Sequence, residues 1–307
     1  MEFIKKIYNW SGTWTGTIII VLSIMFFFAQ AFVIPSGSMK NSLLIGDMLF
    51  VKKFSYGIPL PKTPGVFGLP SIQLVPDFNN NGHLIEGDRP ERGDIVVFLY
   101  PRNPKIHFVK RCIATGGDIV RLKDKHLFIR PKGGDDYIIK NYPENMRVEI
   151  ENKLWVKDPY RIKHPGIHND PTVTKNTSGN LPIFDMMPTI VPEDEFFMMG
   201  DNRDHSHDSR FWGSVHYKYI IGTPWFIYFS WENRSYNLLL KGTKNTQPDH
   251  APLHEVCKNI DIESKDCLKI WDSEYHKIKW DRVFQTPNQL ENSKYINKAN
   301  IHTKGIY

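Results

Sequence analysis

A serine in a turn-forming string and a lysine in an apolar string are the clearest candidates for catalytic residues in this sequence. Ser38 lies in the string Pro35-Ser-Gly-Ser-Met39, and Lys110 lies in the string His107-Phe-Val-Lys-Arg-Cys-Ile-Ala114. A serine hydroxyl becomes a nucleophile when a base takes its proton and backbone N–H groups hold the resulting oxyanion. Alone, the serine string is more typical of a linker, so Ser38 needs support from elsewhere in the chain.

Lys110 can act as a base only if its amine is neutral. Alternation along a strand places Lys110 and Cys112 on one face and Val109, Arg111 and Ile113 on the other, which favours burial of the lysine. An ordinary lysine is neutral less than about 0.1% of the time at pH 7. Burial disfavours the ammonium form, and a pKa near 7 requires roughly 4.6 kcal/mol of destabilisation.

A third polar cluster is the run Gly200-Asp-Asn-Arg-Asp-His-Ser-His-Asp-Ser-Arg210. Its alternating acids and bases predict a loop with internal ion pairs. His205 and His207 with neighbouring aspartates form a weak candidate for a divalent metal, but no distant third ligand is evident. We therefore expect no metal and no cofactor.

The remaining motifs exclude several classes of protein. The chain has no G-x-S-x-G, no G-x-x-x-x-G-K-[ST], no H-E-x-x-H and no S-x-x-K. The formal net charge of +6 over 307 residues is mild and no dense basic run occurs, so nucleic acid is not an expected partner. The 41% hydrophobic and 23% charged residues are ordinary for a globular protein.

An apolar segment near the N-terminus predicts a membrane anchor. No charged residue lies between Ile7 and Met39, and a helix over residues 14–34 would be roughly 31 Å long, close to the thickness of a bilayer core. Lys5 and Lys6 before it favour a cytoplasmic N-terminus over residues 1–13 and an exported body. Ala29-Gln-Ala31 leaves a cleavable signal peptide open as the second interpretation, although the retained anchor is favoured.

The body after residue 35 is expected to be predominantly β. Strand patterns recur, among them 43–51, 92–100, 107–114 and 219–231, and no stretch beyond residue 40 has helical periodicity. Residues 57–90 predict a loop insertion, residues 131–190 a second β subdomain within a catalytic region of 35–234, and residues 235–307 a peripheral polar extension with a closing strand near Lys279–Val283. Cys112 is expected to be a buried free thiol, and a disulfide between Cys257 and Cys267 remains open.

The polar strings together resemble the successive boxes of the bacterial type I signal peptidases, which are serine endopeptidases with a Ser/Lys dyad. The matching positions are Pro35–Met39, Ile45-Gly-Asp47, Lys110-Arg111 with Gly117-Asp118, and Gly200–Arg210, in the family's order and spacing. The resemblance runs from about residue 14 to 231, and its last box is very specific.

This resemblance implies a role for each matching residue. Ser38 corresponds to the nucleophile and Lys110 to the general base. Ser36 corresponds to the hydroxyl that completes the oxyanion hole with the backbone N–H of Ser38, and Ser206 to the serine that orients the lysine amine. The positions that correspond to bracing ion-pair residues are Asp201, Arg111, Asp208 and Arg210.

The resemblance also implies bent antiparallel sheets and a substrate that binds as an extended strand, with small residues at the −1 and −3 positions. The expected partners are secreted preproteins and membrane lipid, and the expected location is the bacterial inner membrane, single-pass, with the catalytic body on the periplasmic side. Three features depart from the family pattern: Lys40-Asn-Ser42 after Met39, His205 and His207 around Ser206, and one evident anchor where some members have two.

The expected function is removal of signal peptides after A-x-A-like sites. A self-cleaving Ser/Lys regulator is the second hypothesis, against which the apolar segment and the lack of a DNA-binding helical region argue. An inactive, anchored envelope scaffold is the third, against which the set of Ser38, Lys110 and Ser206 argues.

Overall fold

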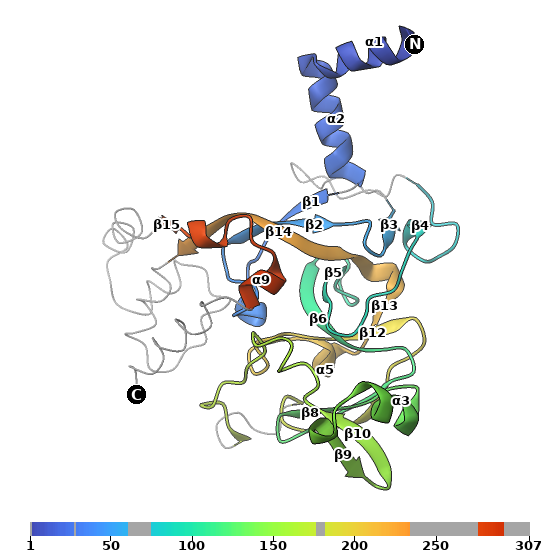
Figure 1. The fold of residues 1–307 in the computed structure, drawn as a ribbon, viewed down its shortest axis with the longest axis vertical. Helices are drawn as coiled ribbons and strands as arrows, with labels where there is room; N and C mark the ends of the chain where they lie inside the picture. The colour runs from blue at the N-terminus through green and yellow to red at the C-terminus, as the bar shows by residue number, and fades with distance from the viewer. Residues whose placement is uncertain (1, 28, 61–74, 176–181, 234–275, 292–307) are drawn as a thin grey trace.

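A computed structural model describes residues 2–27, 29–60, 75–175, 182–233 and 276–291 of the chain. Two helices project from one end of a mostly β body: α1 (Glu2–Ser11) lies across the tip of α2 (Trp14–Phe27) (Figure 1). Most of the large apolar side chains described on these helices are exposed, including Phe3, Tyr8 and Trp14. Among the described residues, no helix is long and apolar enough to cross a membrane.

The predicted helix over residues 14–34 is confirmed to Phe27 and is wrong from Ala29 onward. The helix ends at Phe27, and β1 (Ala29–Val33) pairs antiparallel with β2 (Asp47–Lys52), so that Ala29 lies opposite Lys52 and Ala31 opposite Phe50. β-Branched and aromatic residues near the end of the apolar run suit a half-buried strand, and the neighbouring strand decides which structure they adopt. The Ala29–Ala31 tripeptide is thus part of the folded sheet.

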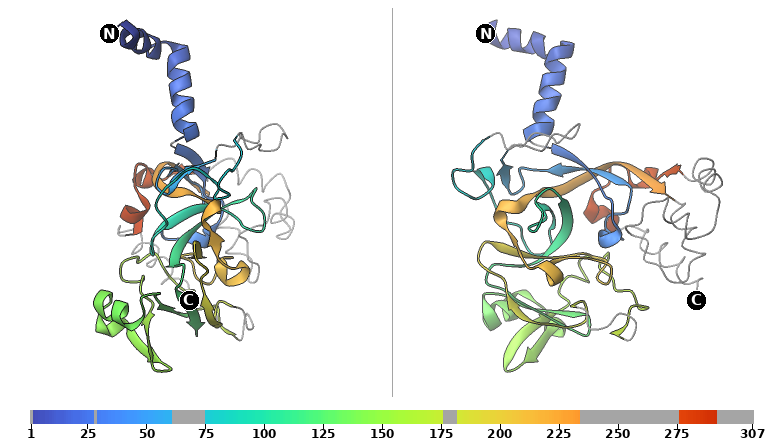
Figure 2. Two further views of the ribbon diagram at one scale, coloured as in Figure 1. Left: turned by 90° about the vertical axis from the view of Figure 1, so that its right-hand side faces the viewer. Right: turned by 180° about the vertical axis from the view of Figure 1, so that it is seen from behind.

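The main sheet has eight antiparallel strands in the order β1-β2-β14-β5-β6-β12-β13, with β15 pairing on β14. β5 spans Ile95–Leu99, β6 His107–Thr115, β12 Glu195–Met199, β13 Val215–His216 and β15 His276–Ile278. The long strand β14 (Ile220–Asn233) pairs with β5 at its start, with β2 in its middle and with β15 at its end, and its register shifts at three places. Such bulges bend a strand, and they let β14 curl across the body (Figure 2). The prediction of bent antiparallel sheets is confirmed.

A second sheet forms the end of the body opposite α1 and α2 (Figures 1 and 2). Its order is β11-β7-β8-β10-β9, from strands Ile119–Lys123, His126–Arg130, Arg147–Ile150, Lys153–Lys157 and Met186–Ile190 (β7 to β11 in chain order). This end of the body begins near residue 119, because the β7–β8 hairpin belongs to its sheet, and a separate β subdomain over 131–190 remains a prediction. This end also includes the short helix α3 (Gly134–Asn141), which the sequence patterns did not predict.

The remaining elements are short. The predicted insertion at 57–90 contains a hairpin of β3 (Gly57–Pro59) and β4 (His83–Glu86). The single-turn helices are η1 (Gly37–Met39), η2 (Glu144–Met146), α5 (Ser209–Trp212), η3 (Tyr217–Tyr219), η4 (Trp280–Arg282) and α9 (Pro287–Glu291).

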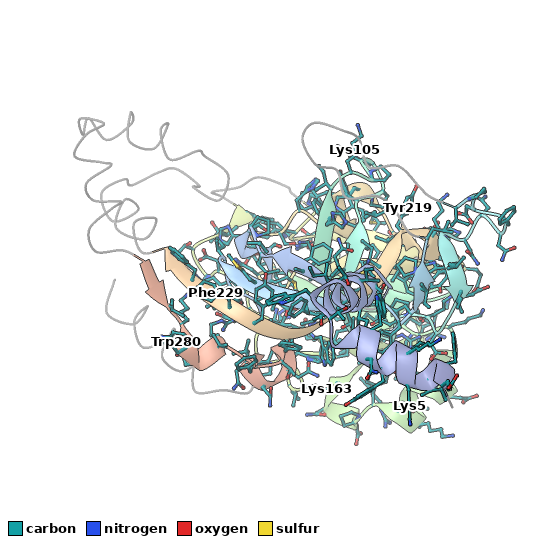
Figure 3. The ribbon with its side chains drawn as sticks, turned by 90° about the horizontal axis from the view of Figure 1, so that it is seen from above. Lys5, Lys105, Lys163, Tyr219, Phe229 and Trp280 are labelled. Carbon is teal, nitrogen blue, oxygen red and sulfur yellow. The ribbon has the colours of Figure 1, made fainter. Side chains whose placement is uncertain are left out.

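The C-terminal segment is not peripheral where the structure describes it. The strand expected near Lys279–Val283 is instead β15, a few residues earlier, followed by the helical turn η4. Trp280 lies beside the end of β14 that carries Phe229 (Figure 3). Arg282, Leu290 and Glu291 are at most 2% exposed, so this segment belongs to the core. Cys112 is a buried free thiol as predicted, whereas Cys257 and Cys267 lie outside the described residues.

Candidate active site

The candidate nucleophile lies on a tight helical turn that follows β1. Ser38 is the central residue of η1 and is 7% exposed. The next residues hold the turn in place, since Met39 and Leu43 are fully buried in an apolar cluster and the Leu43 N–H donates to the Met39 carbonyl at 2.8 Å. Ser36 Oγ lies 3.4 Å from Ser38 Oγ, and its expected role in an oxyanion hole remains a prediction.

Lys110 lies on β6, opposite Val96 of β5, and is 4% exposed. Its Nζ donates to Ser38 Oγ at 2.5 Å and to the Val109 carbonyl at 3.0 Å, and it lies 5.3 Å from the centre of the Phe108 ring. Residues 72 positions apart in sequence are thus in direct contact. The predicted burial of Lys110 is confirmed.

Burial also changes the protonation of Lys110. Burial removes solvent from the amine and lowers the pKa of Lys110 to about 8. The carboxylates of Asp208 and Asp201 raise this pKa, but burial outweighs them. An amine with that pKa is neutral in about one molecule in ten at pH 7, roughly two orders of magnitude more often than an exposed lysine. A base whose pKa is close to the working pH is suited to proton transfer.

The loop of residues 200–210 supports the nucleophile through its backbone. The Asn202 N–H donates to the Ser38 carbonyl at 3.1 Å, and its side-chain amide donates to the Gly37 carbonyl at 3.1 Å. Gly200 is packed so closely that a β-carbon there would lie 2.5 Å from the Ser38 carbonyl oxygen and would also meet the Ser206 side chain. The loop and the turn are therefore in direct contact.

A buried ion pair connects this loop to β6. Arg111 Nε and Nη2 donate to the two oxygens of Asp201 at 2.8 and 2.7 Å, and neither side chain is exposed. Ser42 Oγ donates to Asp201 Oδ2 at 2.5 Å, which extends the network to the nucleophile turn. Burial opposes ionisation of Asp201, but the Arg111 guanidinium outweighs it and lowers the pKa of that carboxyl.

Asp208 and Arg210 form a second brace within the same loop. Asp208 caps α5 and accepts from Gly200 N at 3.0 Å and from Arg210 Nε at 2.7 Å. Arg210 Nη2 in turn donates to the Arg203 carbonyl at 2.6 Å. These contacts fix both ends of the loop, because Gly200 and Arg210 are held by one carboxylate.

Ser206 is buried next to Gly200. Among the described residues its Oγ makes no hydrogen bond to Lys110, and its hydroxyl helps to lower the pKa of the neighbouring Asp208 carboxyl. Its expected role in orienting the lysine remains a prediction. The two histidines beside it have different environments: His205 Nε2 lies 2.9 Å from Asp170 Oδ2, whereas the exposed His207 ring packs against Phe211. The part of the chain that the structure describes contains no cluster of three metal-ligating side chains.

The departure Lys40-Asn-Ser42 has a structural explanation. Asn41 has a positive φ of 78°, a conformation that asparagine tolerates better than most residues, and its side-chain amide lies 3.0 Å from His168 Nδ1. Ser42 supplies the hydroxyl that bonds Asp201. Both residues therefore hold the nucleophile turn in place.

Three contributors to the site had no assigned role from sequence alone. Asn202 lies inside the loop box, so its position was recognised but its two hydrogen bonds to the nucleophile turn were not. Arg282 donates to Asp47 at 2.5 and 3.0 Å, and Glu291 contacts Arg111. These last two lie in the polar C-terminal region, where no motif distinguishes them from surface charges.

Comparison with known proteins places the chain in a family. The sequence profile described as "Signal peptidase, peptidase S26" matches residues 7–231. Two proteins named Signal peptidase I from two strains of Helicobacter pylori are 42% and 41% identical, over 95% and 98% of this chain and 97% and 99% of their own. The chain belongs to the peptidase S26 family. It is therefore a serine peptidase, and the expected family assignment is confirmed.

More distant family members are also similar. A protein named Signal peptidase I from Pseudomonas fluorescens is 34% identical over 69% of each chain. A crystal structure of a signal peptidase I from Enterococcus faecalis is 24% identical and covers 44% of this chain and 97% of that chain, with a TM-score of 0.28, a similarity too low to carry an argument about the site.

The lowered pKa of Lys110 predicts the pH dependence of this peptidase. If neutral Lys110 is the base, kcat/KM rises with pH along a limb with a midpoint near 8, because the ammonium form is inactive. We expect His207→Asn to leave this midpoint within about half a pH unit, since His207 is exposed and Lys110 Nζ donates to Ser38 and Val109 instead. A pH series of kcat/KM with a peptide substrate measures both. A limb with a midpoint below 7 that disappears in His207→Asn would assign it to the histidine instead.

Proposed function

We propose that this peptidase removes N-terminal signal peptides from exported preproteins, with Ser38 as nucleophile and Lys110 as general base. The observation that carries the proposal is the 2.5 Å contact between Lys110 Nζ and Ser38 Oγ, made by two buried groups. Family membership supports the substrate class, since the curated relatives are named as signal peptidases.

The proposed reaction has two stages. The neutral amine of Lys110 takes the Ser38 proton as Oγ attacks the scissile carbonyl, and the Ser36 hydroxyl with the Ser38 N–H stabilises the oxyanion. The resulting ammonium protonates the leaving amine, and an acyl-enzyme remains on Ser38. Water, activated by Lys110, then releases the signal peptide's new carboxylate and regenerates the site.

The supporting residues would hold this geometry during both stages. Arg111 and Asp201 connect β6 to the nucleophile turn, and Asp208 and Arg210 hold the loop that carries Ser206. All four are buried, so their ion pairs are protected from solvent screening. Ser206 lies near the dyad, and we propose that its hydroxyl orients the lysine once substrate excludes water.

We propose that the substrate binds as an extended strand, with small residues at the −1 and −3 positions, and that the enzyme acts at the outer face of the bacterial inner membrane. The exposed apolar side chains of α1 and α2, with Lys5 and Lys6 on α1, are suited to contact with lipid (Figure 3). Attachment at the membrane would raise the local concentration of both partners.

The experiment is cleavage of a purified preprotein by the full-length enzyme in detergent. A preprotein with alanine at −1 and −3 is expected to be cut once, between the −1 residue and the mature protein, and the same preprotein with a bulky −1 residue is expected to remain intact. Ser38→Ala serves as the blank for contaminating proteases. Cleavage of both preproteins, or cleavage of neither by native enzyme, would contradict the proposed substrate class.

A further inference from the structure

The last described segment of the chain packs beneath the nucleophile turn. Leu290 of α9 is 1% exposed and belongs to the same apolar cluster as Met39 and Leu43. In Figure 1 the red α9 lies next to a blue helical turn from the N-terminal part of the chain. A second contact lies earlier in the segment, where Arg282 binds Asp47 and donates to the Ser42 carbonyl at 3.4 Å.

Glu291, next to Leu290, is 1% exposed and places its carboxylate on Arg111. Its other oxygen lies 2.8 Å from Nδ1 of His164, a residue that is 7% exposed. Arg111 is completely buried, and its Nη2 donates to two carboxylates, Asp201 from the loop and Glu291 from α9. Burial disfavours the charged guanidinium, but Asp201 and Glu291 outweigh burial and raise the pKa of Arg111.

Arg111 connects Glu291 to both members of the dyad. It follows Lys110 directly on β6, and through Asp201 it reaches Ser42 and the nucleophile turn. If the Glu291 carboxylate is removed, the Arg111 guanidinium is free to rotate toward its remaining acceptors. These are Asp201 and the Gly93 carbonyl, to which Arg111 Nη1 donates at 2.7 Å. A displacement of about 1 Å in a catalytic group can lower a rate by up to about a hundredfold.

We infer that Glu291 is a positioning residue for the Ser38–Lys110 dyad, acting through Arg111. The inference rests on the proposed function, because it assumes that Ser38 and Lys110 perform the chemistry. It assigns a catalytic contribution to a residue 60 positions beyond the end of the family match at residue 231. The negative charge of the Glu291 carboxylate is what positions Arg111; the packing of the Glu291 side chain is not sufficient.

The test compares three variants of the full-length enzyme in cleavage of the same preprotein. Glu291→Gln keeps the shape and removes the charge, whereas Glu291→Asp keeps the charge with a shorter reach. The matched control is Glu193→Gln, which makes the same change in an exposed pair with Lys132. We expect kcat to fall in the order Glu, Asp, Gln, by about tenfold for Gln, with KM within about twofold and the control unchanged.

Thermal unfolding of each variant, followed by assay well below its midpoint, separates positioning from loss of folded protein. If Glu291→Gln has the native kcat, or a higher kcat than Glu291→Asp, the Glu291 side chain acts by packing and the inference fails. If Glu291→Gln does not fold, Glu291→Asp decides: lowered kcat with unchanged KM supports the inference, and native kcat overturns it. Ser38→Ala is assayed in parallel, and its residual cleavage would instead overturn the proposed function.

Discussion

Replacing Lys110 by methionine is expected to lower cleavage by at least about ten-thousandfold at pH 8, to the level of Ser38→Ala. Methionine keeps most of the volume of the lysine but cannot accept the Ser38 proton, and the hydroxyl is a weak nucleophile without a base. Because the two residues act as a unit, the double variant should be no slower than either single one. Single-turnover assays with excess enzyme measure rates this low.

The same substitution should stabilise the folded protein at neutral pH. Burial lowers the pKa of Lys110 from 10.5 to about 8, so between these values the unfolded chain binds more protons than the native one. Stability conferred by this residue therefore rises with pH from 8 to 10.5, and the full penalty of about 3 kcal/mol applies below pH 8. Lys110→Met should raise the free energy of unfolding at pH 7 by up to about this amount, and the gain should vanish above pH 10.5.

The matched control is Lys105→Met, since Lys105 is exposed and extends from the β5–β6 connection at the edge of the body (Figure 3). It should change neither cleavage nor stability measurably. Denaturant unfolding at pH 7 and pH 10.5 gives the stability comparison. Substantial cleavage by Lys110→Met would refute the dyad, and a loss of stability at pH 7 would show that the Lys110 ammonium is better solvated than its burial indicates.

Gly200→Ala is expected to lower kcat/KM by about a hundredfold although it adds a single methyl group. That methyl would lie 2.5 Å from the Ser38 carbonyl oxygen and would also meet Ser206, so the nucleophile turn or the loop must move. Overpacking a buried site costs about 1–3 kcal/mol, and a shift in the turn separates Ser38 from Lys110.

Gly12→Ala is the control for Gly200→Ala, because its added methyl would meet one atom at the ordinary distance of 3.7 Å. Cleavage and thermal unfolding of both variants are measured together. We expect Gly12→Ala to resemble the native enzyme. If Gly200→Ala keeps its activity within about threefold, the contact between the loop and the turn is more adaptable than the packing indicates.

Runs of apolar and β-branched residues correctly predicted the strands that pair with strands close to them in the sequence. The apolar, β-branched runs around residues 95–99 and 107–115 form β5 and β6, and Lys110 and Cys112 of β6 are both buried as expected. Pattern failed at residues 29–33, because an apolar segment suits a helix or a strand equally and pairing with β2 decides between them. It also missed α3, an eight-residue helix, the length at which helical periodicity is weakest.

Much of the site could also be predicted from the order of its residues. Ser38, Lys110 and the Gly200–Arg210 loop were candidates by residue type, whereas Ser36 and the catalytic roles came from the family resemblance; the structure brings Ser38 and Lys110 within 2.5 Å. Cys257 and Cys267 lie outside the described residues, and the roles of Ser206 and of the bracing ion pairs remain predictions.

The sequence by itself determined that this chain carries a serine, a lysine and a polar loop in the order of a peptidase family. Only the tertiary structure decided that Lys110 is buried enough for its pKa to fall to about 8, because desolvation depends on every element packed around the amine. It also decided that Glu291 contacts Arg111 across 180 residues of chain. A surface glutamate and a buried one are identical in sequence, and only the fold of the C-terminal segment distinguishes them.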